Sequence, residues 1–267
     1  MIRQPAVAGQ FYPSERKQLL QQVEALLKQD AAVQQVIAAI APHAGYSYSG
    51  AIAGELFASI EIPRLVILLG PNHHGAGAAI ALSGAQAWAT PLGEVPLAGK
   101  LREALLTAID PLVIDDQAHS FEHSLEVMLP FLQKRRNDLE IVPISLGRLN
   151  LADCLMLGHG LAQVVSSWDE DVLLLASSDM NHFDSATATE KLDTMAIEAM
   201  TALDPERLYR VVREQQISMC GVLPVVAVMQ TARLLGAQEC HLLQHAHSGM
   251  VNGDDSRVVG YAGLTVV

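Results

Sequence analysis

The feature that most constrains this chain is a series of short apolar runs that each end abruptly in a polar, histidine-bearing segment. A run of this kind, four to eight residues long and uninterrupted, is typical of a strand buried on both faces of a sheet. The three clearest runs, with the polar residues that follow them, are 36–41 with His43, 65–69 with His73 and His74, and 172–176 with Asp179 and His182.

Longer amphipathic segments alternate with these runs. In residues 18–28 the leucines and Val23 recur at helical spacing. Further helices are expected at 101–109, 121–132, 151–165, 190–202, 205–214 and 222–235, and further strands at 141–146, 240–247 and 257–266. This alternation predicts an α/β fold: one domain over residues 1–267, with a central mostly parallel or mixed sheet and helices on both faces.

Composition narrows the class of protein. Half of the 267 residues are apolar and only 4% are aromatic, so the core must be built from aliphatic side chains. A net charge of -12 disfavours binding to nucleic acid and to anionic membranes. No apolar run approaches the roughly 20 residues of a membrane span. Three scattered cysteines without a Cys-x-x-Cys pair predict reduced thiols and a cytoplasmic location, and the low charge is compatible with a homodimer.

The polar segments predict a site. In open α/β sheets, ligands bind in the crevice beyond the carboxyl ends of the strands, so His43, His73, Asp179 and His182 are expected to converge there. Two histidines with a carboxylate suit non-haem Fe(II), whereas three histidines suit zinc. A single loop histidine is more often only hydrogen-bonded; the convergence of several favours a metal site. Residues 41–50, with two glycines, are expected to form a loop beside it.

Two further groups of histidines are open to more than one interpretation. Residues 119–123 match His-x-x-Glu-His, an inverted zinc-peptidase pattern. A helix that begins after Ser120 would leave His119 outside it, and would instead place His123 and Glu126 in a first turn aimed at the crevice. In the predicted strand 240–247, the three histidines at 241, 245 and 247 share odd parity and are expected on one face, with His247 nearest the site.

Six segments, in order along nearly the whole chain, resemble those of the Memo family, known in bacteria as AmmeMemoRadiSam system protein B. The segments are Gly9-Gln-Phe-Tyr-Pro13, Ala41-Pro-His-Ala-Gly-Tyr46, Gly70-Pro-Asn-His-His74, Glu122-His-Ser-Leu-Glu126 with Leu129-Pro130, Ser177-Ser-Asp179 with His182, and Cys220-Gly221. The resemblance implies a fold similar to that of the class III extradiol dioxygenases, which use non-haem Fe(II).

The resemblance also implies roles for individual residues. His43 and His73 match the two metal-binding histidines of the family, and His182 falls where the dioxygenases have their acid–base histidine, beside Asp179. The third ligand of the family comes from the loop before the last strand, where alignment places Met250, a poor donor for Fe(II). The expected metal ligands are therefore His43, His73 and His182, with Asp254 or His247 as other donors.

Three functional hypotheses follow. The first is a metal-dependent oxidoreductase, similar to a dioxygenase, that acts on a small molecule; Fe(II) is the expected cofactor, with copper or zinc as alternatives, and His182, Asp179 and His123 are the expected catalytic residues. The second is a non-catalytic binding or metal-handling partner of a radical S-adenosylmethionine enzyme, with a vestigial pocket. The third, zinc-dependent hydrolysis, ranks last because it needs three good ligands and an activated water.

Overall fold

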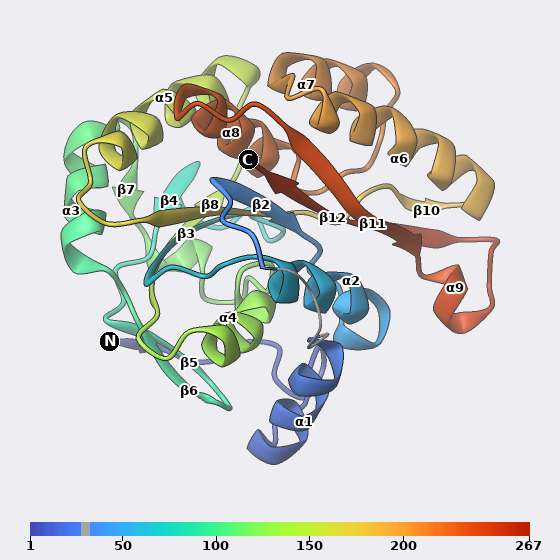
Figure 1. Cartoon of the computed structure of the whole chain (residues 1–267), viewed down its shortest axis with the longest axis horizontal. Coiled ribbons are helices and arrows are strands. Elements are labelled where there is room, and N and C mark those ends of the chain that lie inside the picture. Colours follow the sequence, from blue (N-terminus) through green and yellow to red (C-terminus); the bar gives the residue numbers. More distant parts are fainter. Residues whose placement is uncertain (28–32) are drawn as a thin grey trace.

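A large mixed sheet forms the centre of the molecule, as the computed structural model of residues 1–27 and 33–267 shows (Figure 1). Its strand order is β10-β12-β2-β9-β3-β8-β4-β7, with β11 paired to β12, and a small second sheet has the order β1-β5-β6. The strands are β1 Ile2–Arg3, β2 Ala38–Ala41, β3 Leu65–Pro71, β4 Ile80–Leu82, β5 Ala87–Thr90, β6 Gly93–Pro96, β7 Val113–Ile114, β8 Glu140–Leu146, β9 Val172–Ser177, β10 His182–Asp184, β11 Cys240–His247 and β12 Val258–Val266.

Helices cover both faces of this sheet, which confirms the predicted α/β class (Figure 1). They are α1 Arg16–Leu26, α2 Tyr46–Ser59, α3 Gly99–Ala108, α4 Leu129–Arg135, α5 Leu151–Ser166, α6 Ala186–Thr201, α7 Pro205–Glu214, α8 Val222–Leu234 and α9 Gly249–Asn252, with short 3-10 turns η1 Asp116–Ala118 and η2 Glu126–Met128. The predicted end of the first helix at residue 28 lies outside the described residues. No described helix is long and apolar enough to cross a membrane.

The central strands are apolar throughout because each face of the sheet has its own core. In β3, the side chains of Leu65, Ile67 and Leu69 pack with α5 and α8, whereas those of Val66 and Leu68 pack with α1, α2 and α4 on the other side. Successive side chains of a strand point to opposite faces, so a strand covered on both sides needs apolar residues at every position.

The segment 121–132 departs from the prediction of one continuous helix. The chain forms a turn, then η2, and only then α4 from Leu129. Pro130 explains the start of α4, because proline has no N–H to donate and is tolerated only in the first turn of a helix. The turn before it is fixed by Glu122, whose carboxylate accepts the backbone N–H groups of His123 and Ser124.

The four central strands β2, β9, β3 and β8 lie parallel and adjacent. Their carboxyl ends therefore meet at one edge of the sheet, which is where the chain places His43 after β2, His73 after β3 and Asp179 after β9. The crevice expected at these strand ends follows directly from this topology.

Candidate metal centre

Three histidines come together at the carboxyl edge of the sheet. His43, His73 and His123 each offer a ring nitrogen, and these three nitrogens lie within 4.8 Å of one another. It is the one such group of potential metal ligands among the described residues. The ring of His73 stacks on that of His123, with centroids 4.7 Å apart, and the ring of His43 meets both edge-on. We call these three residues the histidine centre.

A hydroxyl orients the ring of His43. Its Nδ1 lies 2.6 Å from Ser177 Oγ, and that hydroxyl donates its single proton to the carbonyl of Ser124 at 2.7 Å. The Nδ1 of His43 must therefore carry a proton and donate it to the hydroxyl oxygen. This assignment leaves a lone pair on Nε2 of His43, the atom free to bind an ion.

A buried carboxylate orients the ring of His73. Glu122 Oε1 lies 2.9 Å from the Nδ1 of His73, and Oε2 accepts the backbone N–H of the same residue at 2.7 Å. Burial raises the pKa of Glu122, but the hydrogen bonds from His73 and Ser124 outweigh it and hold that pKa well below its usual range. The ionised carboxylate fixes the Nδ1–H form of His73, the arrangement that metal-binding histidines usually have.

Two imidazoles of the centre, those of His43 and His123, are neutral at physiological pH. Burial, followed by repulsion from neighbouring imidazoles, holds the pKa of His43 well below 6.5, and burial lowers the pKa of His123 to about 4. Neutral imidazole is the form that binds metal ions, so these two residues do not have to lose protons before an ion binds.

A thiol and a carboxyl group adjoin His43. Cys220, just before α8, has its Sγ 3.2 Å from His43 Nε2 and accepts the backbone N–H of Asp179 at 3.3 Å. Asp179 accepts the backbone N–H of His43 at 2.8 Å, and burial raises its pKa to about 7. Burial also raises the pKa of the Cys220 thiol, which therefore carries its proton in the absence of an ion.

The ring of His182 is held by the loop that precedes α8. Its Nδ1 lies 2.9 Å from the carbonyl oxygen of Ser218, an acceptor, so Nδ1 carries the proton and Nε2 the lone pair. Burial lowers the pKa of His182; the hydrogen bond to Ser218 opposes this effect, and repulsion from the neighbouring imidazole of His73 adds to it. His182 is thus a neutral base close enough to the centre to interact electrostatically with it, but the group of ligand atoms contains His123 instead.

The structure therefore brings together His43, His73 and His123, with Asp179 and His182 beside them. His123 was expected to reach the crevice as a catalytic residue from the first turn of a helix; its grouping with the two expected ligands was not predicted. Cys220 was not among the expected site residues, although it lies just before the predicted helix 222–235 and belongs to one of the Memo-like segments.

Other expected site residues lie elsewhere. Met250 is 64% exposed on α9, so the sulfur next to the histidines is that of Cys220. Glu126 is fully buried, but it binds Arg3 at 2.6 Å instead of pointing into the crevice. His119 is buried with its Nε2 3.1 Å from the carbonyl of Ala81, so it forms no ligand pair with His123.

The three histidines of β11 do not share a face. The pairing with β12 shifts by one residue between Leu242 and Gln244, so His241 pairs with Thr265 whereas His245 and His247 pair with residues of the opposite parity. A bulge of this kind turns every later side chain to the other face. His241 is consequently exposed beside Glu239, whereas His247 is buried.

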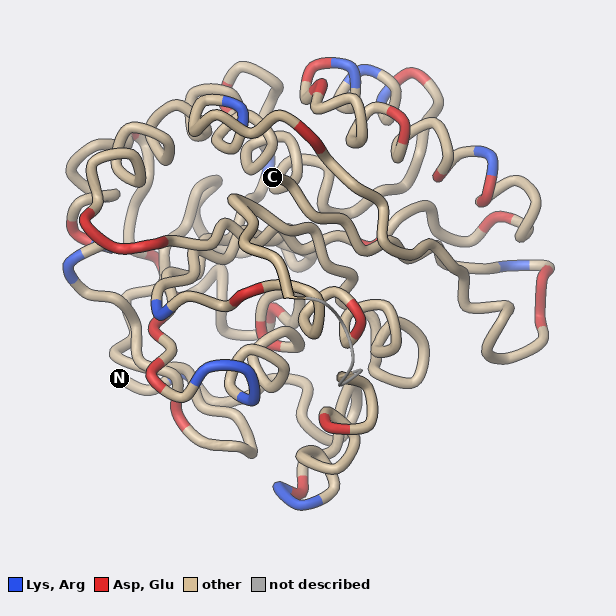
Figure 2. The backbone as a smooth tube through the Cα atoms, viewed as in Figure 1, with Lys and Arg blue, Asp and Glu red and all other residues tan. Residues whose placement is uncertain are grey.

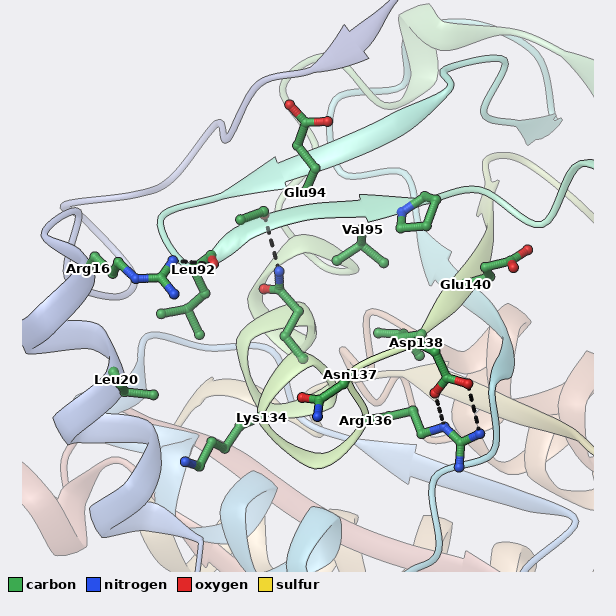
Figure 3. Close-up of a pocket in the computed structure, with 14 residues that line it drawn as sticks. Arg16, Leu20, Leu92, Glu94, Val95, Lys134, Arg136, Asn137, Asp138 and Glu140 are labelled. Carbon is green, nitrogen blue, oxygen red and sulfur yellow. Dashed lines mark hydrogen bonds and ion pairs between the residues drawn. The ribbon is translucent and has the colours of Figure 1, made fainter.

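A hollow of about 530 Å³ lies between α1, β6 and the end of α4 (Figure 3). Its cationic side chains are already engaged: Lys134 pairs with Glu24, Arg136 with Asp138, and Arg16 with the carbonyl of Leu92. It contains none of the residues of the histidine centre. Along the described chain, Lys and Arg occur singly or in short runs such as 134–136, between acidic and uncharged stretches (Figure 2).

Comparison with known proteins gives consistent matches. The family model described as "Memo-like protein" matches residues 3–265. A MEMO1 family protein of Aquifex aeolicus is 40% identical, with 98% of each chain covered, and one of Methanothermobacter thermautotrophicus is 36% identical, with 99% of this chain and 100% of the relative covered. A solved structure of an uncharacterized Escherichia coli K12 protein shares the fold, with a TM-score of 0.61, 14% identity, and coverage of 85% of this chain and 98% of that one.

Proposed function

This chain belongs to the Memo-like family, and from that premise we propose that its histidine centre binds a divalent transition-metal ion and supports metal-dependent oxidation of a small molecule. The observation that carries the proposal is the grouping of His43, His73 and His123, whose ring nitrogens lie within 4.8 Å of one another.

The donor set fits such an ion. Hydrogen bonds to Ser177 and Glu122 place protons on Nδ1 of His43 and His73, which leaves lone pairs on their Nε2 atoms; that of His43 faces the thiol of Cys220. The centre combines imidazole nitrogens with an adjacent thiol, a set suited to iron, copper or zinc and poorly suited to magnesium or calcium. We propose Fe(II) as the resident ion, held by the three histidines with Cys220 available as a further donor, because the resemblance to the class III extradiol dioxygenases implies iron. Three histidines also suit zinc, which is the alternative ion.

When bound, ferrous iron would supply a centre at which dioxygen and an organic substrate react together. The protein would supply the proton transfers. His182 is neutral because burial lowers its pKa, and its Nε2 bears the lone pair, so it can accept a proton from a substrate hydroxyl. Asp179 would hold the backbone of His43 in place through the hydrogen bond that its Oδ1 accepts.

The alternative of a vestigial pocket that serves a radical S-adenosylmethionine enzyme was motivated by Met250 in the place of a ligand. The position of Cys220 beside His43 supports a functional metal site over this alternative. A partner protein remains a prediction, testable by affinity capture from the native host.

The decisive experiment compares two single variants. The protein is reconstituted anaerobically with Fe(II), zinc or copper, and the bound metal is measured by elemental analysis. We expect about one ion per chain in the parent, a loss of binding in His123→Gln, and retained binding in His182→Gln. The matched control is His159→Gln, an exposed histidine of α5. Loss in His182→Gln with retention in His123→Gln would instead assign His182 as the third ligand.

An oxygen-consumption screen against catechol-like small molecules tests the chemical part of the proposal. Iron-loaded parent should consume oxygen with a substrate, and iron-loaded His182→Gln should do so about 10²–10⁴-fold more slowly, the usual contribution of a general base. Metal binding with no oxygen consumption by the parent across the screen would argue for a metal-handling role.

A further inference from the structure

Asp193 of α6 is a fully buried carboxylate outside the histidine centre, and each of its two oxygens has a hydrogen-bond partner. Its Oδ1 accepts the backbone N–H of Asn181 at 2.9 Å, and its Oδ2 lies 2.8 Å from Nε2 of His245 in β11. A buried charge is costly unless it is hydrogen-bonded or paired. Asp193 therefore has to keep both contacts, and one of them fixes the turn between Asp179 and His182.

Strand β12 leaves space for the carboxylate of Asp193 at Gly260. A Cβ atom on Gly260 of β12 would collide with Oδ2 of Asp193, so only glycine leaves room for the carboxylate. The same glycine donates its N–H to the carbonyl of Asn181 at 2.8 Å and accepts the N–H of Met180 at 2.8 Å. The backbone of Asn181 is thus fixed from β12 through its carbonyl and from α6 through its N–H.

The side chain of Asn181 links this region to Ser218, which in turn binds His182. Asn181 is buried, and its Oδ1 accepts both the backbone N–H of Ser218 at 3.1 Å and the hydroxyl of Ser218 at 3.0 Å. The hydroxyl oxygen of Ser218 accepts the backbone N–H of His182 at 2.7 Å, and the carbonyl of Ser218 accepts the ring Nδ1–H of His182 at 2.9 Å. A continuous set of hydrogen bonds therefore joins His245 and Asp193 to the ring of His182.

We propose that Asp193, held by His245, is a positioning residue that acts through Asn181 and Ser218 to keep His182 in its Nδ1–H form with Nε2 free. This inference rests on the proposed role of His182 as the proton acceptor, and it identifies what prepares that residue for the role. The negative charge of Asp193 also raises the pKa of His182, and so partly offsets the lowering of that pKa by burial.

The tautomer of His182 is the readout, because a residue that only stabilises the fold would leave it unchanged. Long-range ¹H–¹⁵N correlation spectra of the full-length, metal-free protein at pH 8 distinguish protonated from unprotonated ring nitrogens. We expect a single Nδ1–H form for His182 in the parent. In Asp193→Ala the backbone N–H of Asn181 loses its acceptor, and we expect His182 to become a mixture of both tautomers.

Two companion variants separate positioning from folding. Asp193→Asn keeps an oxygen that can accept from Asn181, and we expect it to restore the single Nδ1–H form. Glu190→Gln, a matched acidic position on α6 that faces His247, should leave His182 unchanged. A single Nδ1–H form in folded Asp193→Ala would overturn the proposal, and so would an Asp193→Asn protein as mixed as Asp193→Ala.

If Asp193→Ala does not fold, Ser218→Ala decides the question. Ser218 is exposed, and the variant removes the hydroxyl that joins Asn181 to His182. A mixture of tautomers supports the pathway, and an unchanged His182 contradicts it. Because these spectra need no metal and no substrate, they test the positioning role even if the metal-binding experiment fails.

Discussion

At the scale of single residues, the protonation states in the crevice are set by burial and by a few hydrogen bonds. Burial keeps the imidazoles of His43 and His123 neutral, whereas the hydrogen bonds from His73 keep Glu122 ionised. The sequence placed His43 and His73 together because both follow apolar runs. It did not reveal that Glu122 would orient His73, because that contact joins residues 49 positions apart.

A first prediction concerns Asp179, whose pKa is raised to about 7 from 3.8 by burial. Between pH 4 and pH 7 the native metal-free protein keeps a proton that the unfolded chain releases, so this carboxyl lowers stability as the pH rises through that range. Asp179→Asn keeps an acceptor for His43 and removes the effect. In urea unfolding, the free energy of unfolding of Asp179→Asn, relative to that of the parent, should increase by a few kcal/mol between pH 4 and pH 7. A difference that does not change with pH would contradict the raised pKa.

A second prediction concerns Glu122, which binds both the ring and the backbone N–H of His73. In Glu122→Gln the amide can replace only one of the two acceptor oxygens. Loss of such a contact behind a metal ligand typically weakens metal binding about 10–100-fold. Competition with a chromogenic chelator measures this, with the exposed Glu94→Gln as control. Equal affinity in the two variants would exclude Glu122 from orienting a ligand.

At the scale of elements, periodicity predicted α5, α7, α8 and β11 to within one or two residues, because each has a clear apolar pattern and clear ends. It missed α2, whose first turn was expected to belong to a loop because of Gly45 and Gly50. Within α2, Gly50 and Gly54 serve the packing of the helix against the end of α1, where a Cβ on either residue would meet Leu26. Glycine in such a helix indicates a close approach of two helices, which a single sequence cannot distinguish from a turn.

A third prediction follows from that contact. A Cβ on Gly54 would collide with the backbone carbonyl of Leu26, and backbone cannot move aside as a flexible side chain can. Gly54→Ala should therefore cost about 1–3 kcal/mol of unfolding free energy. Gly99→Ala is the matched control, because a Cβ on Gly99 at the start of α3 meets nothing within 4 Å and should change stability by less than about 0.5 kcal/mol. Denaturant titration of both variants provides the comparison.

At the scale of the whole molecule, the alternation of strands and helices predicted the fold class. It did not predict that the N-terminal segment contacts the segment that carries Glu122 and Glu126. Arg3 donates to the carbonyl of Glu122 and to the carboxylate of Glu126, and Glu126 also accepts from the hydroxyl of Tyr12 at 2.6 Å. These contacts span more than a hundred residues of sequence. Short-range patterns cannot predict them, although an arginine and a glutamate that are both buried have to be paired.

A fourth prediction tests this long-range pair. Arg3→Met leaves the buried carboxylate of Glu126 without its cation, which typically costs about 3–5 kcal/mol. Adding Glu126→Gln removes the unpaired buried charge and keeps one acceptor oxygen at that position. The double variant should therefore be less destabilised than the sum of the two single variants. Strict additivity of the three unfolding free energies would show that the pair is not coupled.

The proposed function depends above all on His43, His73 and His123 holding one metal ion together. X-ray absorption spectroscopy of the protein loaded anaerobically with Fe(II) tests this directly, because multiple scattering from imidazole rings reports how many histidines bind the iron. We expect three imidazole ligands in the parent and in His182→Gln, and no ordered histidine-bound iron in His123→Gln, which should lose the ion. Three imidazoles in His123→Gln, or no ordered histidine ligation in the parent, would contradict a metal site built from these three histidines.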